Sequence, residues 1–509
     1  MAAQVARHAP PVKDHQPVVL FNASTRLEGL SLNAAYAMLT GWSIRLVGTP
    51  VIHWGCQAGL RPCVLGTNQR VPSSSPPCPR CIAQSNTIYK GAPVHWFTFQ
   101  VETELQAALS RLTLEELSLF CYEDLPLGEL VLPSLRWILR RHHLQDDEHT
   151  RFLYKQYILS AYSMSRQFRH LLAEVQPKAV MVFNGMFYPE AVVRWLSQTS
   201  GIRVISHEVG LRPFTGFFTQ GEATAYPIAI PPEFELSEQQ EARLDCYLEE
   251  RFQGNFSMAG IRFWPEMHNL GEDFWRRATS FKQVVPVFTN VIFDTSQGHA
   301  NVTFPHMFAW LDLVLEIIKR HPETLFVIRA HPDEMRLGKE SQESVADWAQ
   351  NRQVEALSNV LLVASQEYFS SYELIQRSKF VMVYNSTIGL EASVLGVPVL
   401  CGGKARFTQI STVFFPVTPD EYRLKAEEFL SIEHIRVPDE YRRNARRFLY
   451  YQLFCSSLSF ENYLQEDRIW RGYVALKPFD WQQLLPENSP TLRVILDGLL
   501  CGKSFDEEG

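Results

Sequence analysis

The fold of this chain is decided by two stretches, Arg329-Ala330-His331-Pro332-Asp333-Glu334 and Tyr384-Asn385-Ser386-Thr387-Ile388-Gly389-Leu390-Glu391. Each stretch follows an apolar run, Leu325–Ile328 or Phe380–Tyr384, that is typical of a buried parallel strand. Each therefore places polar side chains at the carboxyl end of a strand, where open α/β sheets bind ligands. The two stretches predict two β-α units of one doubly wound sheet.

The later stretch also predicts a helix start. Asn385, Ser386 and Thr387 can cap a helix that Gly396 and Pro398 end, and hydroxyls with free N–H groups at a helix start form an anion site. Ordinary capping is the alternative explanation for a Ser-Thr pair between a strand and a helix. Together with the arginine and the histidine of the earlier stretch, the pair predicts a diphosphate or nucleotide site.

Apolar runs of strand length alternate with helical patterns along most of the chain. The runs predicted as strands are Val18–Phe21, Ile44–Val47, Lys178–Phe183, Arg203–Ser206, Val284–Phe288, Leu325–Ile328, Val360–Val363, Phe380–Tyr384 and Val397–Cys401. This alternation predicts an α/β fold with two Rossmann-like domains that face a cleft, followed by a helical C-terminal extension.

The domain boundaries follow from these patterns. Residues 1–16 are expected to be disordered, residues 17–270 and 271–430 to form the two Rossmann-like domains, and residues 431–509 to form the extension. Within the first domain, residues 211–270 are expected to be loops and an interdomain connection with one polar helix. No G-x-G-x-x-G follows the first strand of either half, which counts against a dehydrogenase, and no G-x4-G-K-[ST] is present, which excludes a P-loop NTPase.

Composition limits the partners and the location. The chain has 509 residues, of which 46% are hydrophobic and 20% charged, and its formal net charge is −7. It contains no basic tract or nucleic-acid motif, so nucleic acid is not an expected partner. It also contains no signal-type apolar stretch and no window of the ~18 apolar residues that a membrane span needs. We expect a cytoplasmic protein, and peripheral attachment to the inner face of a membrane stays open.

Four of the nine cysteines form a cluster with the spacing Cys56-x6-Cys63-x14-Cys78-x2-Cys81. Glycines and prolines surround them, which indicates a loop region in the first domain at residues 55–82. Four thiolates with a C-x2-C half suit a tetrahedral structural zinc ion. An iron–sulfur cluster uses the same four ligands, and four unligated thiols are the remaining alternative.

The C-terminal half resembles the GT-B glycosyltransferases known as capsular polysaccharide biosynthesis proteins, a grouping akin to bacterial Kdo- and sialyl-transferases. The matching segments are Thr289–Asp294, Arg329–Glu334, Tyr384–Glu391 and Gly396–Gly403, continued by Phe407-Thr408 and Glu421-Tyr422. Two N-terminal segments, Phe183–Glu190 and Ser206–Gly210, resemble acceptor-side loops, with Met186 where an arginine is expected. The resemblance implies that a sugar moves from a nucleotide sugar to a glycan or glycolipid in cell-surface polysaccharide biosynthesis.

The resemblance also implies roles for individual residues. His331, Ser386 and Thr387 would hold the phosphates of the donor, and Glu391 would contact its ribose. The whole set expected at the donor comprises Thr289, Asn290, Asp294, Arg329, His331, Glu334, Ser386, Thr387 and Glu391, and the set expected at the acceptor comprises Asn184 and Gly185. Hydroxyls and N–H groups at a helix start accept the charge of a departing phosphate, which stabilises the transition state.

Inverting sugar transfer needs a base that takes the proton of the acceptor hydroxyl. Glu208 is the first candidate because it follows the strand Arg203–Ser206 and precedes Gly210. His207 could be the base instead or could orient the substrate. Glu190 is the third candidate, although an acid at a helix start is often a capping residue.

No catalytic metal is expected. The acidic cluster Asp146-Asp147-Glu148 follows no strand, unlike the Asp-x-Asp of metal-dependent transferases, so protein groups are expected to neutralise the donor phosphates. Two other functions stay open: a nucleotide-sugar epimerase or hydrolase on the same scaffold, and a non-catalytic assembly factor of polysaccharide synthesis. Aromatic residues within 211–275 favour an acceptor groove and therefore the transferase.

Overall fold

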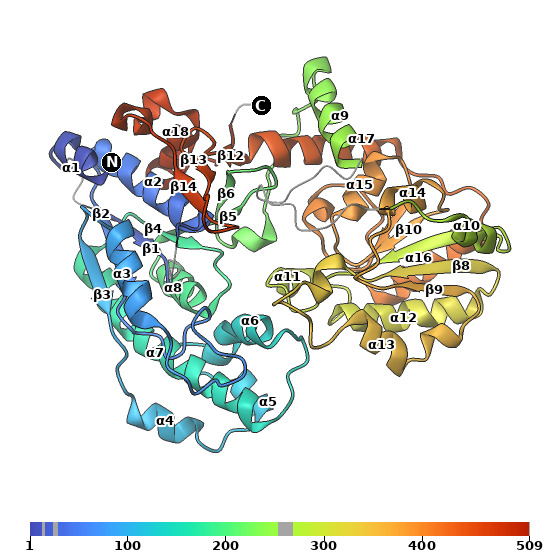
Figure 1. Cartoon of the computed structure of the whole chain (residues 1–509), viewed down its shortest axis with the longest axis horizontal. Coiled ribbons are helices and arrows are strands. Elements are labelled where there is room, and N and C mark those ends of the chain that lie inside the picture. Colours follow the sequence, from blue (N-terminus) through green and yellow to red (C-terminus); the bar gives the residue numbers. More distant parts are fainter. Residues whose placement is uncertain (13–15, 24–28, 253–267, 508–509) are drawn as a thin grey trace.

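The computed structural model describes residues 1–12, 16–23, 29–252 and 268–507. The described chain forms two α/β domains, each built on its own sheet (Figure 1). Strands near the centre of each sheet, such as Val18–Phe21 and Thr324–Arg329, are buried along their whole length, as expected of strands that helices cover on both faces. This architecture confirms the predicted fold of two Rossmann-like domains.

The N-terminal domain contains a seven-stranded sheet with the order β12-β6-β5-β4-β1-β2-β3. Its strands are β1 (Val18–Phe21), β2 (Val51–Cys56), β3 (Val94–Phe97), β4 (Ala179–Phe183), β5 (Arg203–Val209), β6 (Thr215–Gln220) and β12 (Ser457–Ser459). The strands from β3 to β5 run parallel, whereas β6 is antiparallel to both of its neighbours. The carboxyl ends of β4 and β5, which carry Asn184 and Glu208, therefore lie side by side at one edge.

The C-terminal domain contains a parallel five-stranded sheet with the order β11-β10-β7-β8-β9. Its strands are β7 (Gln283–Phe288), β8 (Thr324–Arg329), β9 (Val360–Val363), β10 (Val381–Val383) and β11 (Val399–Cys401). The chain order reverses between β7 and β10, and open α/β sheets bind ligands at such a switch point. The two motifs singled out in the sequence follow β8 and β10, on either side of β7.

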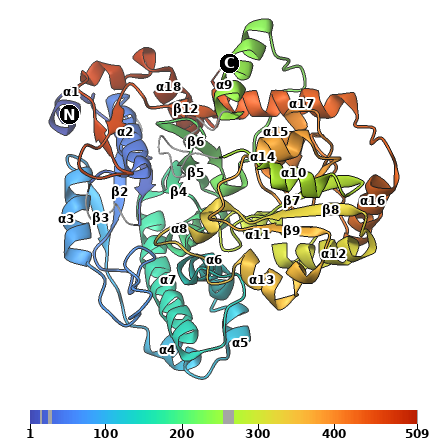
Figure 2. The ribbon, with the colours of Figure 1, turned by 45° about the vertical axis from the view of Figure 1, so that its right-hand side comes forward.

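Helices cover both faces of the two sheets (Figure 2). Those of the N-terminal domain are α1 (Ala2–His8), α2 (Leu32–Leu46), α3 (Cys78–Ile88), α4 (Thr103–Leu109), α5 (Leu114–Ser118), α6 (Leu127–Leu139), α7 (Glu148–Val175) and α8 (Tyr188–Thr199). The remaining helices are α9 (Glu238–Phe252), α10 (Glu272–Ala278), α11 (Gln297–Ala300), α12 (Met307–Arg320), α13 (Val345–Asn351), α14 (Ser371–Gln376), α15 (Ile388–Val394), α16 (Pro419–Ser431), α17 (Asp439–Tyr450) and α18 (Pro490–Leu496).

The C-terminal extension returns to the N-terminal domain. Helix α17 packs against α15 of the C-terminal domain, and β12 then joins the N-terminal sheet beside β6 (Figure 1). The extension is helical as predicted, and it also contains the short strands β12, β13 (Leu464–Glu466) and β14 (Val474–Leu476). The last helix, α18, packs against α2 of the N-terminal domain. The first and last parts of the chain therefore share one hydrophobic core.

Several local predictions were wrong. Ile44–Val47 was predicted as a strand, but residues 44–46 end α2, because most of this helix is buried and a short apolar run fits either element. Gly41 lies within α2 and lets the helix lie against Leu20, whose Cδ1 would be 2.8 Å from an added Cβ. Residues 2–8, expected to be disordered, form α1, in which Val5 is buried and His8 stacks on Trp481 at 4.2 Å.

The region 211–270 was predicted to be loops with one polar helix. The helix is present as α9, but β6 lies in the same region and Phe217 and Phe218 of this strand are core residues, not part of an acceptor groove. Residues 253–267, and with them part of the predicted connection, lie outside the described residues.

Candidate active site

A pocket opens at the carboxyl edge of the C-terminal sheet. Its volume is about 610 Å³, including the solvent at its mouth. It is lined by Arg251, Phe288, Thr289, Arg329, Ala330, His331, Pro332, Ser371, Tyr372, Ser386, Thr387, Ile388 and Glu391. The structure thus brings together six of the residues predicted to bind the donor, from the ends of β7, β8 and β10.

The end of β8 contributes a cation and an imidazole. Arg329 is 5% exposed, and its Nη1 donates to the Glu367 carbonyl at 3.3 Å, whereas its Nη2 has no hydrogen-bond partner among the described residues. Burial lowers the pKa of Arg329 to about 10, so the guanidinium stays charged at neutral pH. His331 accepts the Asp333 N–H on Nδ1 at 3.1 Å, which places a neutral ring's proton on Nε2. Burial lowers the pKa of His331, which favours this neutral form.

Two hydroxyls lie where β10 leads into α15. Ser386 and Thr387 are half-buried, and both line the pocket. Thr387 is the N-cap residue of α15, yet its side chain makes no capping hydrogen bond. Ordinary capping therefore does not explain Thr387, and neither hydroxyl of this pair has a hydrogen-bond partner among the described residues.

Glu391 is held by two side chains that sequence reasoning missed. Arg251 of α9 donates to Glu391 Oε1 through Nε at 2.6 Å, and the Tyr372 hydroxyl donates to Oε2 at 2.6 Å. Glu391 is 3% exposed, so the charge of Arg251 offsets the cost of burying its carboxylate. No local pattern could have identified Arg251, which lies on a polar surface helix and 140 positions from its partner.

The other predicted donor residues have different surroundings. The Thr289 hydroxyl donates to the Arg329 carbonyl at 3.0 Å and so ties β7 to β8. Asn290 accepts the Asn385 N–H at 3.2 Å, and Asp294 is exposed beyond β7. Glu334 is 1% exposed and does not line the pocket: it accepts the Val345 N–H at 2.8 Å, and burial raises its pKa to about 8. This carboxyl group holds the start of α13.

The predicted acceptor loop lies at the carboxyl edge of the N-terminal sheet. Asn184 and Gly185 follow β4 with φ values of +60° and +85°. The Asn184 amide donates to Glu208 Oε2 at 2.8 Å and so positions this carboxylate at the end of β5. Burial raises the pKa of Glu208 to about 7, a shift that the Asn184 hydrogen bond reduces and Asp294 increases. A carboxylate with this pKa suits proton transfer near neutral pH.

The other two candidates for the base lie in the core. His207 precedes Glu208 and points to the opposite face of the sheet, where it is 1% exposed and stacks on Phe218. Burial lowers the pKa of His207 to about 3. Glu190, in the first turn of α8, is 4% exposed, and burial raises its pKa to about 8. Neither His207 nor Glu190 takes part in the hydrogen bond between Asn184 and Glu208.

The two domains meet at α11. His299 on this helix contacts Glu222 Oε2 at 3.1 Å and the Thr224 hydroxyl at 3.0 Å, both in the N-terminal domain. Asp294, which precedes α11, acts electrostatically on both Glu208 and His331. The Glu208 carboxyl group and the His331 imidazole, one from each domain, are therefore both within electrostatic range of Asp294.

The four clustered cysteines line a different pocket, at the carboxyl edge of the N-terminal sheet. All four are half-buried, and none forms a disulfide. Burial raises the pKa of Cys56 and of Cys63 to about 12. Among the described residues, no three His, Cys, Asp or Glu side chains are arranged so that they could hold a metal ion.

Residues 272–411 match the family described as capsule polysaccharide biosynthesis protein, which confirms the predicted resemblance for the C-terminal domain. No curated protein sequence matches the chain. None of the described helices is long and apolar enough to cross a membrane.

Solved structures with limited similarity include two transferases and an epimerase. The beta Kdo 2,4 transferase of Thermosulfurimonas dismutans KpsC is 9% identical (TM-score 0.36; 55% of this chain and 80% of that chain). The beta Kdo 2,7 transferase of the same KpsC is 12% identical (TM-score 0.33; 67% of this chain and 90% of that chain). UDP-GlcNAc 2-epimerase of Methanocaldococcus jannaschii is 9% identical (TM-score 0.26; 85% of this chain and 98% of that chain). Because these TM-scores are below 0.5, the fold assignment rests on the strand order and the family match.

Proposed function

We propose that this protein is an inverting glycosyltransferase that takes its sugar from a nucleotide-activated donor and passes it to a glycan or glycolipid acceptor in capsule polysaccharide synthesis. The observation that carries the proposal is the arrangement of donor groups in the C-terminal pocket. Among the described residues, Arg329 Nη2 and the hydroxyls of Ser386 and Thr387 have no hydrogen-bond partner there, beside His331. Such donors suit the phosphates of a nucleotide sugar.

The chemistry follows from the two sides of the site. The Glu208 carboxylate takes the acceptor hydroxyl proton, and the acceptor oxygen attacks the anomeric carbon from the face opposite the leaving group. The bond from this carbon to the phosphate oxygen breaks, and Arg329 and the two hydroxyls stabilise the negative charge on the departing phosphate. Attack from the opposite face inverts the anomeric centre.

Protein groups supply the charge that a metal provides in other transferases. Among the described residues that line the pocket, Glu391 is the only carboxylate, and Arg251 and Tyr372 already engage it. Hard divalent cations prefer several oxygen ligands, which this lining does not offer. We therefore propose that transfer proceeds equally well in magnesium-free buffer and in buffer with added magnesium.

The experiment is a panel of nucleotide sugars incubated with the protein, with and without glycan acceptors, while nucleotide release is measured. Acceptor-dependent release and a product of inverted configuration support the transferase. Release or epimerisation without any acceptor would instead indicate the hydrolase or epimerase. If no nucleotide sugar binds or reacts, the proposal is wrong and a non-catalytic role in assembly becomes the better account.

A further inference from the structure

Cys56, Cys63, Cys78 and Cys81 come from three separate elements and meet in one pocket. Cys56 ends β2, Cys63 lies in the loop that follows, and Cys78 and Cys81 open α3. The pocket has a volume of about 460 Å³, including the solvent at its mouth, and is otherwise lined by Ala23, Ala58, Leu60, Leu65, Gly66, Pro76, Pro77 and Ile82. Among the described residues that line this pocket, the four cysteines therefore carry the only polar side chains.

Backbone donors already surround two of the sulfurs. The Gly66 N–H donates to Cys63 Sγ at 3.1 Å, and the backbone N–H groups of Gly59 and Leu60 lie near the Cys56 sulfur, where they lower the pKa of this thiol against the effect of burial. Hydrogen bonds of this kind stabilise thiolates, which are the form of cysteine that binds metals. Gly66 is required at this place, because an added Cβ would be 2.6 Å from Pro76 and 3.0 Å from Cys63 Sγ.

The other two thiols lie in the first turn of α3, an 11-residue helix. Cys78 and Cys81 are three residues apart and share one face of the helix. The positive end of the helix dipole favours thiolates at this position. No side chain caps the helix start, since the N-cap residue is Pro77.

The loop between Cys56 and Cys78 is fixed to the domain by Leu60 and Val64, which are buried in the domain core, and by polar contacts. The Tyr188 hydroxyl donates to the Pro62 carbonyl at 2.8 Å, and the Thr67 and Tyr157 hydroxyls are 2.7 Å apart. The Arg61 N–H donates to the Ser160 hydroxyl at 2.9 Å. These contacts keep Cys63 close to the end of β2. The four cysteine side chains are not arranged as metal ligands in this structure, so zinc binding requires the thiols to reorient around the ion.

We propose that these four cysteines bind one structural zinc ion as a tetrathiolate. A ligand set of sulfur alone excludes the hard cations magnesium and calcium and suits zinc, and four protein ligands leave no open position for catalysis. The apolar lining fits a closed structural site. Four neighbouring thiolates repel one another, and a divalent cation between them would offset their negative charge. The ion would clamp the loop 57–77 and the start of α3 to the sheet edge.

The first test measures metal and ligation in the full-length protein purified without chelator. Elemental analysis should give one zinc per chain, and X-ray absorption should show four sulfur neighbours at about 2.3 Å. Absence of zinc near one equivalent overturns the proposal. So does iron with inorganic sulfide, or zinc with nitrogen or oxygen neighbours.

The second test compares two cysteine variants. Cys78→Ser should lose most of the zinc, whereas Cys121→Ser, which alters an exposed cysteine outside the pocket, should retain one equivalent. Zinc retained by Cys78→Ser overturns the assignment. If Cys78→Ser does not fold, replacement of zinc by cobalt in the unmodified protein decides the question, because only a tetrahedral cobalt–thiolate site gives the expected intense visible bands.

Discussion

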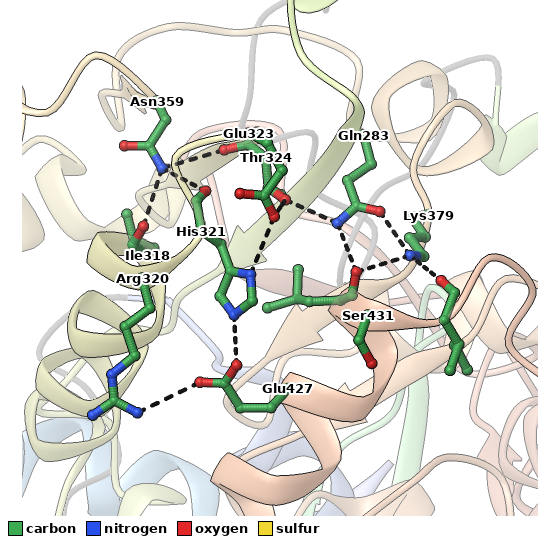
Figure 3. A network of polar contacts seen from close by, with 12 residues as sticks. Gln283, Ile318, Arg320, His321, Glu323, Thr324, Asn359, Lys379, Glu427 and Ser431 are labelled. Carbon is green, nitrogen blue, oxygen red and sulfur yellow. Dashed lines mark hydrogen bonds and ion pairs between the residues drawn. The ribbon is translucent and has the colours of Figure 1, made fainter.

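The two edges of the C-terminal sheet carry the same dipeptide in opposite surroundings. His321-Pro322 precedes β8, and His331-Pro332 follows it. At the amino edge, the His321 ring contacts Glu323 Oε1 at 3.2 Å and Glu427 Oε2 at 2.5 Å (Figure 3). At the carboxyl edge, His331 lines the pocket.

At the amino edge of the sheet, side-chain N–H groups donate hydrogen bonds to backbone carbonyls at the ends of helices. Asn359 donates from Nδ2 to the carbonyls of Ile318 and His321, at 3.1 and 3.0 Å, where α12 ends (Figure 3). Lys379 donates to Gln283 Oε1 at 2.7 Å and to the Leu430 carbonyl at 3.2 Å, where α16 ends. These contacts satisfy helix carbonyls that have no partner within their own helix.

The difference between the two edges suggests a criterion for separating structural from functional polar groups: whether they have hydrogen-bond partners within the protein. The side chains of His321, Asn359 and Lys379 at the amino edge hydrogen-bond within the protein and contribute to stability. At the carboxyl edge, Arg329 Nη2 and the hydroxyls of Ser386 and Thr387 have no partner among the described residues. Unpaired polar groups cost stability, so their presence in a pocket indicates a ligand that pairs with them.

The largest effect is expected from Glu208→Gln, at the carboxyl edge of the other sheet. The variant keeps the shape of the side chain and removes the base, so turnover should fall by ~10²–10⁴ while donor binding persists. Steady-state kinetics and calorimetric titration with nucleotide measure the two quantities. Near-normal turnover would contradict the assignment, and Glu190→Gln and His207→Ala would then identify another base. If all three variants stay active, the mechanism is wrong.

The comparison itself is tested by removing one histidine from each edge. His331→Ala should weaken nucleotide binding by about 1.5–3 kcal/mol, the worth of a hydrogen bond to a charged group. His321→Ala is the matched control: it should leave nucleotide affinity unchanged and lower the free energy of unfolding by about 1–2 kcal/mol. Equal nucleotide affinity in the two folded variants would remove the distinction between the edges.

The pH dependence of transfer should follow the ionisation of Glu208. The base acts only when it is deprotonated, and its pKa is raised to about 7, so the rate should rise with pH through this value. Between roughly one unit below and one unit above the pKa, the deprotonated fraction grows about tenfold. A rate profile measured at saturating donor checks this, with Glu208→Gln as the control whose residual rate should lack the transition. A profile that is flat across pH 6–8 would contradict the role.

The smallest effect is expected from a pair of threonine variants that compares a hydroxyl predicted to bind the ligand with a hydroxyl that caps a helix. Thr387→Ala should reduce nucleotide affinity by about 1 kcal/mol and leave stability unchanged, because Thr387 caps nothing. Thr418→Ala should do the reverse, since the Thr418 side chain accepts the Glu421 N–H in the capping box of α16, a contact worth about 1 kcal/mol. Thermal unfolding and nucleotide titration of both variants measure the contrast. A stability loss in Thr387→Ala would support capping instead.

Much of the C-terminal domain could be predicted from the sequence alone. Its strands are short, apolar and flanked by polar turns, so each run marks a strand wherever the rest of the domain lies. The same local logic placed Arg329, His331, Ser386 and Thr387 at strand ends, and the parallel sheet brings those ends together. The family resemblance supplied the predicted roles of these residues, which no local pattern contains.

Features that depend on contacts between residues far apart in the chain were decided by the tertiary structure. It placed Ile44 in a helix, because burial on nearly all sides allows an apolar run to adopt either element. It also brought Arg251 onto Glu391, buried Glu334 beneath α13, and turned His207 into the core while leaving Glu208 beside Asn184. The sequence by itself determined the strands, the strand-end motifs and the cysteine spacing, since these rest on local composition. Only the tertiary structure decided which polar groups are paired, because that depends on contacts between residues far apart in the chain.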